Sequence, residues 1–448
     1  MQPLRTNGLH IDAYIPPKND SYERKFAAEM IKKWAPYKHR FKFEEQRMDK
    51  LVFQKDKISC LIEGTDMKGT MKYKWKKCAC VKNWYGRHCS IPHVVYVGYP
   101  DYDKFILRSK PRKIVQSLTF LNEWAMLYHR LYDTGDVVDA FLITEGVYTG
   151  YGDPKNLTII PELLNHSIPL HEKIIPIVLE DFPNEAQSDG WIAETRIRDL
   201  ALRSTLPPAF EQISNDDIFM YTDADEVPSR EALLFLKLHD NIPEPYVFVM
   251  RKNVFGFYWQ SDVNEIYAGA TFRMMASVFN MDANNLRRKT YSIQRSEMVQ
   301  AYAQKLNTEL GPLVIGDRKH PAGYHCSWCS TSTGIRTKLI SAINADFPRW
   351  GDYPQKCQIA YIESLVSAGR WFTEDLCFET VLSNDTLFAP AYIKQHAEQY
   401  KYLLQRKNGP KCQRKIDSDP GPFIKNWHRM EHTQLLRLLK NNDIHGLT

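Results

Sequence analysis

Three carboxylates stand within four consecutive positions of the segment YTDADEVPS, residues 221–229. They are Asp223, Asp225 and Glu226, and they follow the apolar run IFM. Two carboxylates separated by one residue at the carboxyl end of a strand can bind one divalent cation and, through it, a diphosphate; oxygen ligands suit Mg²⁺ or Mn²⁺. An acidic turn that caps the next helix through Ser229 explains the same residues. The sequence leaves both interpretations open.

A second group of reactive side chains lies in HPAGYHCSWC, residues 320–329. Cys326 and Cys329 form a C-x-x-C pair that suits a zinc half-site, a redox pair or a local disulfide, and the disulfide is favoured in an oxidising compartment. His325 precedes this pair and offers an imidazole that can complete a carboxylate-bound metal, although a lone histidine is more often structural.

A third group lies in NADFPRWGDY, residues 344–353, where Asp346 and Asp352 flank Trp350. A carboxylate beside a tryptophan on a loop suits a general base next to a ring that stacks on a sugar. A turn rich in Pro and Gly, with side-chain to backbone hydrogen bonds, explains the same residues without chemistry.

Other routes to anion binding or hydrolysis have no matching motif. The chain has no G-x-x-x-x-G-K-[ST] loop, no G-x-G-x-x-G before a helix, no H-E-x-x-H and no G-x-S-x-G. A metal bound by the acidic turn is therefore the remaining way to hold a phosphorylated substrate.

Continuous apolar runs predict the elements that position these groups. Such runs, separated by a helix with one apolar face, are typical of parallel strands covered by helices, whose ligands lie beyond the carboxyl ends of the strands. Strands are predicted at 137–143, 173–179 and 216–222, with helices at 190–206, 230–238, 331–344 and 357–372. Aromatic and β-branched segments at 244–260, 268–279 and 288–295 predict a mostly antiparallel extension of the sheet.

The cysteines indicate the compartment. Four of the nine fall in the first fifth of the chain, and the spacing in CACVKNWYGRHCS resembles the C-terminal half of an epidermal-growth-factor-like module. That resemblance implies a Cys80–Cys89 disulfide, and Cys60 is then the nearest partner for Cys78. A zinc site fits this spacing poorly. With Asn-x-Ser/Thr sequons at four positions, the pattern favours an oxidising lumen. The sequons are at Asn19, Asn156, Asn165 and Asn384.

Charge and hydropathy limit the partners. The 448 residues carry 59 Lys and Arg and 53 Asp and Glu, a net +6 that tolerates anionic ligands without demanding nucleic acid. No apolar stretch approaches the roughly 18 residues that span a bilayer, and the first residues lack the apolar core of a signal peptide.

Long sequence words resemble one enzyme family. GWIAE, DADEVPSREALLFLKLHD, EPYVFVMRK, GYHCSWC and DFPRWGDY resemble, in this order, the β-1,4-mannosyl-glycoprotein 4-β-N-acetylglucosaminyltransferases, which add the bisecting GlcNAc to N-glycans. The likeness runs from about residue 78 to 375. It implies a glycosyltransferase A-like α/β fold, a mixed sheet flanked by helices with a small Cys-rich piece ahead of it. It also implies a UDP-GlcNAc donor, Mn²⁺ or Mg²⁺, and a Golgi location with a membrane anchor that is not visible here.

The resemblance also implies roles for single residues. Asp225, supported by Asp223, is expected to bind the metal and the donor diphosphate, and His325 is expected to be a further ligand or a contact to the diphosphate. Glu145 is expected to contact the donor nucleoside and Arg198, with Arg196, the diphosphate. The candidates for the base that deprotonates the acceptor hydroxyl are Asp346, Asp352 and Glu226, and Trp350 is the candidate for acceptor stacking.

The expected organisation has four parts. These are a stem or linker at 1–75, an EGF-like half-module at 76–92, a catalytic domain at 93–385 and a C-terminal helical tail at 386–448. The alternatives are a GlcNAc transferase with a different acceptor, a glycoside hydrolase that uses two carboxylates without a metal, and a lumenal Ca²⁺-dependent carbohydrate-binding module.

Overall fold

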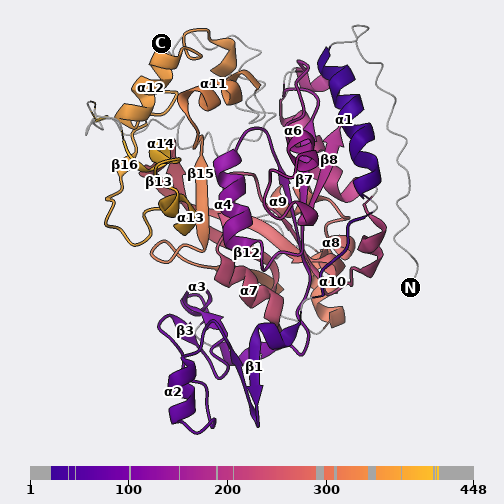
Figure 1. The fold of residues 1–448 in the computed structure, drawn as a ribbon, viewed down its shortest axis with the longest axis vertical. Helices are drawn as coiled ribbons and strands as arrows, with labels where there is room; N and C mark the ends of the chain where they lie inside the picture. Colours follow the sequence, from indigo (N-terminus) through magenta and orange to yellow (C-terminus); the bar gives the residue numbers. More distant parts are fainter. Residues whose placement is uncertain are drawn as a thin grey trace.

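A ten-stranded mixed sheet forms the centre of the molecule (Figure 1). Its strands follow the order β10-β15-β12-β13-β9-β6-β7-β8, with β14 and β16 paired to β12 and β13. This confirms the predicted mixed α/β sheet flanked by helices. The computed structural model describes residues 22–38, 40–45, 47–99, 102–150, 152–187, 190–204, 206–288, 297–306, 310–341, 350–374, 376–406, 409 and 411–412.

The parallel half of the sheet carries the acidic turn. β6 (Ile114–Thr119) pairs in parallel with β7 (Ala140–Gly146) and β9 (Ile218–Tyr221), and β7 pairs with β8 (Ile174–Leu179). The connecting helices are α4 (Trp124–Thr134), α5 (Ile159–Leu164) and α6 (Gly190–Arg203). Nearly every residue of these strands is buried, because helices cover both faces. The carboxyl ends of β6, β7, β8 and β9 therefore share one edge.

The antiparallel half confirms the predicted extension only in part. β12 (Glu244–Val254) and β13 (Gly256–Thr271) pair antiparallel, and β13 pairs with β9. The strand expected at 268–279 is wrong beyond Thr271, where α8 (Phe272–Ser277) begins because the Thr271 hydroxyl accepts a hydrogen bond from the Met274 amide at 3.2 Å. The strand expected at 288–295 lies, except for its first residue, outside the described residues.

Further elements complete the sheet and its cover. α7 (Arg230–Leu238) follows the acidic turn as predicted, yet Ser229 stands at its N-cap position without a side-chain cap hydrogen bond. The remaining strands of this sheet are β10 (Glu226–Pro228), β14 (Leu310–Ile315), β15 (Gly323–Ser327) and β16 (Glu379–Thr380). The other α-helices after residue 92 that the structure describes are α3 (His93–Tyr96), α9 (Ala283–Arg288), α10 (Glu297–Leu306), α11 (Ser332–Ser341), α12 (Ile359–Ala368), α13 (Ala391–Gln395) and α14 (Lys401–Leu404).

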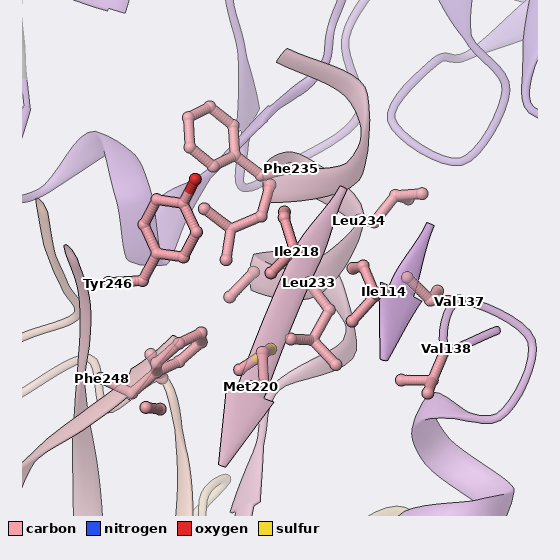
Figure 2. Close-up of a cluster of buried hydrophobic side chains, with 14 of the residues drawn as sticks. Ile114, Val137, Val138, Ile218, Met220, Leu233, Leu234, Phe235, Tyr246 and Phe248 are labelled. Atoms are coloured by element: carbon pink, nitrogen blue, oxygen red, sulfur yellow. The ribbon is translucent and has the colours of Figure 1, made fainter. Parts of the chain in front are cut away.

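The largest hydrophobic cluster joins α7 to the sheet (Figure 2). Leu233 and Phe235 of α7 pack toward Ile218 and Met220 of β9 and toward Phe248 of β12, and all five side chains are buried. Full burial of such a side chain contributes about 1.5–3 kcal/mol. The strand that leads into the acidic turn and the helix that leaves it are thus fixed by the same core.

A small lobe precedes the sheet, and we call residues 47–92 the Cys-rich lobe. It contains β1 (Val52–Lys55), β2 (Ile58–Leu61), α2 (Met67–Lys72), β3 (Trp84–Tyr85) and β4 (Ile91–Pro92), and it lies at the lower end of Figure 1. Both implied disulfides, Cys60–Cys78 and Cys80–Cys89, are confirmed. The Cys60–Cys78 disulfide crosses the boundary predicted at residue 75.

The two ends of the described chain pack on the main body. α1 (Tyr22–Lys38) contacts α5, with Ala27 and Met30 buried, so part of the predicted stem covers the domain. A disulfide joins Cys377 to Cys412. Residues 413–448 of the predicted tail, and 1–21 of the stem with Asn19, lie outside the described residues. None of the helices that the structure describes is both long and apolar enough to cross a membrane.

Candidate functional site

A buried arginine shapes the acidic turn between β9 and β10. Arg130 of α4 donates from Nη1 to the Thr222 hydroxyl at 2.7 Å and from Nη2 to the carbonyl oxygens of Asp223 and Glu226, each at 2.8 Å. The Ala224 carbonyl accepts a further bond at 3.3 Å. Burial lowers the pKa of Arg130 to about 10, so the side chain remains a cation at neutral pH. One guanidinium thus fixes the backbone of the turn and offsets part of its charge.

Two of the three carboxylates in the turn are paired by other arginines. Arg198 of α6 donates to Asp223 Oδ2 at 2.8 Å, and Arg287 of α9 donates to Asp223 Oδ2 at 3.2 Å and to Glu226 Oε1 at 2.9 Å. Glu226 Oε2 accepts the Asp223 amide at 2.9 Å. Burial disfavours the charge of Asp223, yet Arg198 and Arg287 outweigh it and hold the pKa of Asp223 well below its usual range.

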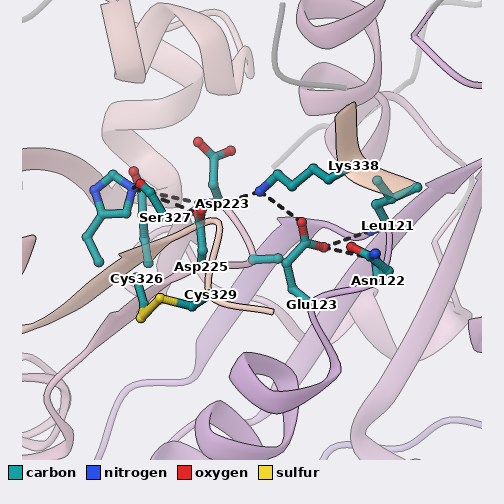
Figure 3. A network of polar contacts seen from close by, with 12 residues as sticks. Leu121, Asn122, Glu123, Asp223, Asp225, Cys326, Ser327, Cys329 and Lys338 are labelled. Carbon is teal, nitrogen blue, oxygen red and sulfur yellow. Dashed lines mark hydrogen bonds and ion pairs between the residues drawn. A yellow bond between two sulfur atoms is a disulfide. The ribbon is translucent and has the colours of Figure 1, made fainter. Parts of the chain in front are cut away.

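Asp225 is the third carboxylate, and its environment differs (Figure 3). Its Oδ1 lies 3.9 Å from His325 Nε2 and its Oδ2 lies 3.6 Å from Lys338 Nζ, both beyond hydrogen-bond distance. Only 13% of its side chain is exposed, and this burial raises the pKa of Asp225. Within the described residues, no group donates a hydrogen bond to this carboxylate. Its charge is therefore the least compensated in the turn.

Lys338 connects α11 to the carboxyl edge of the sheet. Its Nζ lies 3.1 Å from Oε1 of Glu123, whose Oε2 accepts the amides of Leu121 and Asn122 at 3.0 and 3.1 Å (Figure 3). Burial opposes the charge of Lys338, but the carboxylates of Glu123 and Asp225 outweigh it and raise the pKa of Lys338. A permanent cation therefore stands beside Asp225.

His325 reaches the same point from β15. β15 pairs with β10 so that His325 is opposite Glu226, and it pairs with β12 so that His325 is beside Lys252. The Ser327 hydroxyl lies 2.9 Å from His325 Nε2, and His325 Nδ1 is buried without a hydrogen-bond partner in the described part of the chain. The neighbouring Cys326–Cys329 disulfide, favoured from the sequence, is confirmed.

Asp225 and His325 fit a divalent cation as a pair of ligands. Ligand atoms that bind one such ion at about 2.1 Å lie roughly 3–4 Å apart, and the 3.9 Å between Oδ1 and Nε2 falls in that range. No set of three or more His, Cys, Asp or Glu side chains converges on a metal position in the described ranges. Two protein ligands suit Mg²⁺-type sites, in which substrate phosphates and water supply the rest.

Other predicted site residues lie elsewhere or are engaged. Glu145 at the end of β7 is buried, and its carboxylate accepts the amides of Thr158 and Ile159 at 2.8–3.0 Å and binds Lys155 at 3.0 Å. It therefore caps the start of α5. Arg196 pairs with Asp181. Their roles in donor binding stay predictions.

The loop predicted to supply the base is described only at its end. Asp346 lies outside the described residues, and of Asp352 only the backbone is described, in the short 3₁₀ helix Trp350–Asp352. Trp350 packs against the cluster formed around Phe372, with the Lys356 ammonium 4.6 Å from its ring centre. The predicted roles of all three stay open.

A small pocket of about 20 Å³ lies along α6, and none of its lining residues belongs to the acidic turn. Its walls lie beyond the carboxyl ends of β7 and β8 and combine apolar side chains with carboxylates. Among its lining residues are Tyr148, Leu179, Asp181, Phe182, Glu194 and Ile197. Glu194 also pairs with Arg198, which in turn binds Asp223. One helix thus borders the pocket and contacts the turn.

Sequence reasoning missed most of the cations in this site. Arg130, Arg287 and Lys338 lie on separate helices, and Arg130 and Arg287 meet the turn across 92 and 61 residues of chain. No local pattern distinguishes them from surface residues. Only Arg198, on the predicted helix between two strands, was named in advance.

Comparison with known proteins gives a family and three relatives. Residues 99–290 match the model of glycosyltransferase family 17. The relatives are named beta-1,4-mannosyl-glycoprotein 4-beta-N-acetylglucosaminyltransferase: those of Rattus norvegicus and Mus musculus are 36% and 35% identical over 342 residues, and that of Homo sapiens is 35% identical over 335. The matches cover 74–75% of this chain and 62–63% of the relatives, so the chain spans less than two thirds of their length. The segment 99–290, which holds the acidic turn and its arginines, thus matches glycosyltransferase family 17, and the three relatives bear the name of the enzymes that the sequence words resemble.

Proposed function

We propose that this chain is an inverting glycosyltransferase that moves GlcNAc from UDP-GlcNAc, in β1,4 linkage, to the β-linked core mannose of N-glycans. The names of the three relatives support the reaction. The observation that carries the proposal is Asp225, a buried carboxylate that lies beside His325 and Lys338 without a hydrogen bond from a described residue. Such a group suits a cation and the diphosphate of a sugar nucleotide.

Asp225 and His325 would hold Mn²⁺ or Mg²⁺, with Asp223 supporting the turn from its arginine-bound position. When bound, the ion supplies positive charge opposite the diphosphate that leaves. Lys338 contributes a second fixed positive charge at the same place, and Arg198 contributes a third behind Asp223. Charges fixed before the reaction favour the developing negative charge of the leaving group without rearrangement.

The pocket along α6 is our candidate position for the nucleoside end of the donor. It has to widen to admit a nucleoside, because its volume of about 20 Å³ holds little more than one water molecule. Tyr148, Leu179 and Phe182 offer apolar walls there. Asp181 and Glu194, which pair with Arg196 and Arg198, offer carboxylate oxygens as acceptors. A nucleoside here would place its diphosphate toward Arg198 and the acidic turn, consistent with ligand binding beyond the carboxyl ends of parallel strands.

The acceptor hydroxyl attacks the anomeric carbon from the face opposite the diphosphate. The new bond forms as the bond from that carbon to the phosphate oxygen breaks, and the configuration inverts from α to β. A carboxylate must take the hydroxyl proton. We assign this role to Asp346 or Asp352, because both oxygens of Glu226 are already bonded, to Arg287 and to the Asp223 amide.

The disulfides support a lumenal compartment for this reaction. Eight of the nine cysteines form four disulfides, which favours an oxidising compartment. The Golgi lumen is the compartment that fits an N-glycan acceptor, and no nucleic-acid partner is needed to explain the net charge.

The deciding experiment incubates the protein with UDP-GlcNAc, Mn²⁺ and a biantennary N-glycan, followed by mass spectrometry and linkage analysis. We expect UDP release matched by one β1,4-linked GlcNAc on the core mannose, loss of turnover with chelator and its return with Mn²⁺. A GlcNAc at another position would replace the acceptor assignment and keep the transferase. Sugar release without UDP-GlcNAc would indicate a hydrolase, and Ca²⁺-dependent glycan binding without turnover would indicate a binding module.

A further inference from the structure

The positive charge of the chain is concentrated in the Cys-rich lobe. Residues 47–92 contain eleven Lys and Arg and four Asp and Glu, a net charge of +7, whereas the whole chain carries +6. All other residues together therefore carry −1. The net positive charge of the chain therefore belongs to about a tenth of its residues.

The lysines gather around two aromatic rings at the end of α2. We call this group the lysine–aromatic patch: Lys55, Lys72, Tyr73, Lys74, Trp75, Lys76 and Lys77. The Lys55 ammonium lies 4.4 Å from the centre of the Trp75 ring and the Lys77 ammonium 4.2 Å from that of Tyr73. All five lysines are exposed, as is Tyr73 at 46%. The patch therefore presents both positive charge and an accessible ring.

No carboxylate that the structure describes forms an ion pair with these five lysines. The lobe has few acids to offer, and two of them are engaged elsewhere: Asp49 pairs with Arg47, and Glu63 pairs with Arg230 of α7. An exposed cluster of like charges without partners attracts an anionic ligand and repels itself when none is bound.

The turn that carries the patch is held in place. Lys74 and Trp75 both have left-handed backbone angles, with φ of 51° and 58°, and the Trp75 amide bonds back to the Thr70 carbonyl at 3.4 Å. The Cys60–Cys78 disulfide links the end of this turn to β2. The centres of the Phe53 and Trp75 rings lie 5.1 Å apart. The lysines thus project from a fixed backbone, which reduces the entropy lost on binding.

We infer that the lysine–aromatic patch binds an acidic polysaccharide, a sugar chain that carries sulfate or carboxylate groups. Repeated anionic groups match several lysines at once, and the flat, weakly polar face of a sugar ring matches an aromatic side chain. The disulfides place the lobe on the oxidising side of a membrane, whereas the negatively charged lipid surface is that of the cytoplasmic leaflet. This inference is independent of the reaction proposed above.

Heparin is the probe, tested on the whole chain by isothermal titration calorimetry. The patch variant replaces Lys55, Lys72, Lys74, Lys76 and Lys77 with Gln. A matched control replaces five exposed lysines of other regions with Gln: Lys32, Lys110, Lys319, Lys394 and Lys401. We expect the patch variant to bind heparin at least about tenfold more weakly, the control to change less than about twofold, and native binding to weaken steeply between roughly 0.05 and 0.2 M salt.

Three results would overturn the inference. Equal weakening in both variants would show a response to net charge alone, and absence of heparin binding by the native chain would show a solvated surface. Binding to phosphatidylserine vesicles without binding to heparin would assign the patch to a membrane. An unchanged melting temperature in the patch variant confirms that weaker binding is not a loss of fold.

Discussion

The acidic turn and the lysine–aromatic patch both place like charges in a few consecutive residues, but the fold treats them differently. In the turn, Glu226 is buried, Asp223 is partly buried, and both bond to arginines from α6 and α9. Only Asp225 is left without a hydrogen bond from a described residue. In the patch, the lysines are exposed and form no ion pair with described residues. A run of like charges in a sequence therefore predicts neither the local electrostatic potential nor a binding site until the distant residues that contact it are known.

The largest effect is expected for Asp225, the one carboxylate of the acidic turn without an arginine partner among the described residues. Asp225→Asn should reduce turnover at least about 100-fold, because it removes the proposed cation ligand, while the melting temperature without metal does not fall. Burial raises the pKa of Asp225, so its charge destabilises the folded state once the pH exceeds the usual carboxyl range, and the amide lacks that charge. Turnover and thermal unfolding are measured in parallel. Retained turnover would make the turn structural.

The next effect concerns Arg287, which bonds to the acidic turn from α9, compared with Arg230, which forms its ion pairs elsewhere. Arg287→Met leaves Asp223 and Glu226 with less compensation in a buried site and should cost about 3–5 kcal/mol in the free energy of unfolding. Arg230→Met removes exposed pairs to Glu63 and Asp136 and should cost less than about 1 kcal/mol. Denaturant titration at neutral pH measures both. An equal loss in the free energy of unfolding for the two variants would mean that burial does not determine how much an arginine contributes to stability.

A smaller effect is expected where the Cys-rich lobe meets α7. His239 is buried between the Ser90 hydroxyl at 2.8 Å and the Phe235 carbonyl at 2.9 Å, and burial lowers its pKa to about 4. The unfolded chain therefore binds the proton more readily, so stability is complete above about pH 6.5 and falls as the pH drops toward 4. Between pH 7 and 5 we expect a loss of about 2 kcal/mol from this group.

Denaturant titrations at both pH values check this loss. The loss in the free energy of unfolding between pH 7 and 5 should shrink in His239→Gln. It should persist in His396→Gln, a substitution at an exposed position away from the lobe. An equal loss of stability in both variants would show that groups other than His239 cause the decrease at low pH.

The smallest effect is expected for the patch itself. Replacing its five lysines with Gln should change the free energy of unfolding by no more than about 0.5 kcal/mol, since exposed side chains without partners contribute little to stability. UDP release should also stay at the native rate. A loss of several kcal/mol would show that the lysines stabilise the lobe, contrary to their exposure.

Local patterns predicted the strands and helices whose apolar residues are continuous. β8, β9, α6 and α7 follow their predicted ranges closely, whereas β6 was missed. Its run IVQSLT contains Gln116 and Ser117, which look like surface residues yet are fully buried. Gln116 donates to the Thr222 hydroxyl at 3.3 Å, a contact across 106 residues that no local pattern reveals.

The sequence predicted only those site residues that combine a reactive side chain with a recognisable local position. Asp223 and Asp225 follow a strand, and His325 lies beside a conspicuous cysteine pair, so all three were named in advance, and the structure brings them together. Glu123, Arg130, Arg287 and Lys338 reach the site only through tertiary packing. Their side chains determine which carboxylate is left for a ligand. The different roles of the three acids therefore could not be predicted from the sequence.

The four hydrogen bonds of Arg130 have a consequence for protein engineering. They join α4 to the side chain of Thr222 and to three backbone carbonyls of the acidic turn. The shape of the turn is therefore specified outside its own residues, and a transplanted DADE segment would carry the ligands without the scaffold that orients them. A minimal graft has to transfer α4 with Arg130 together with the turn.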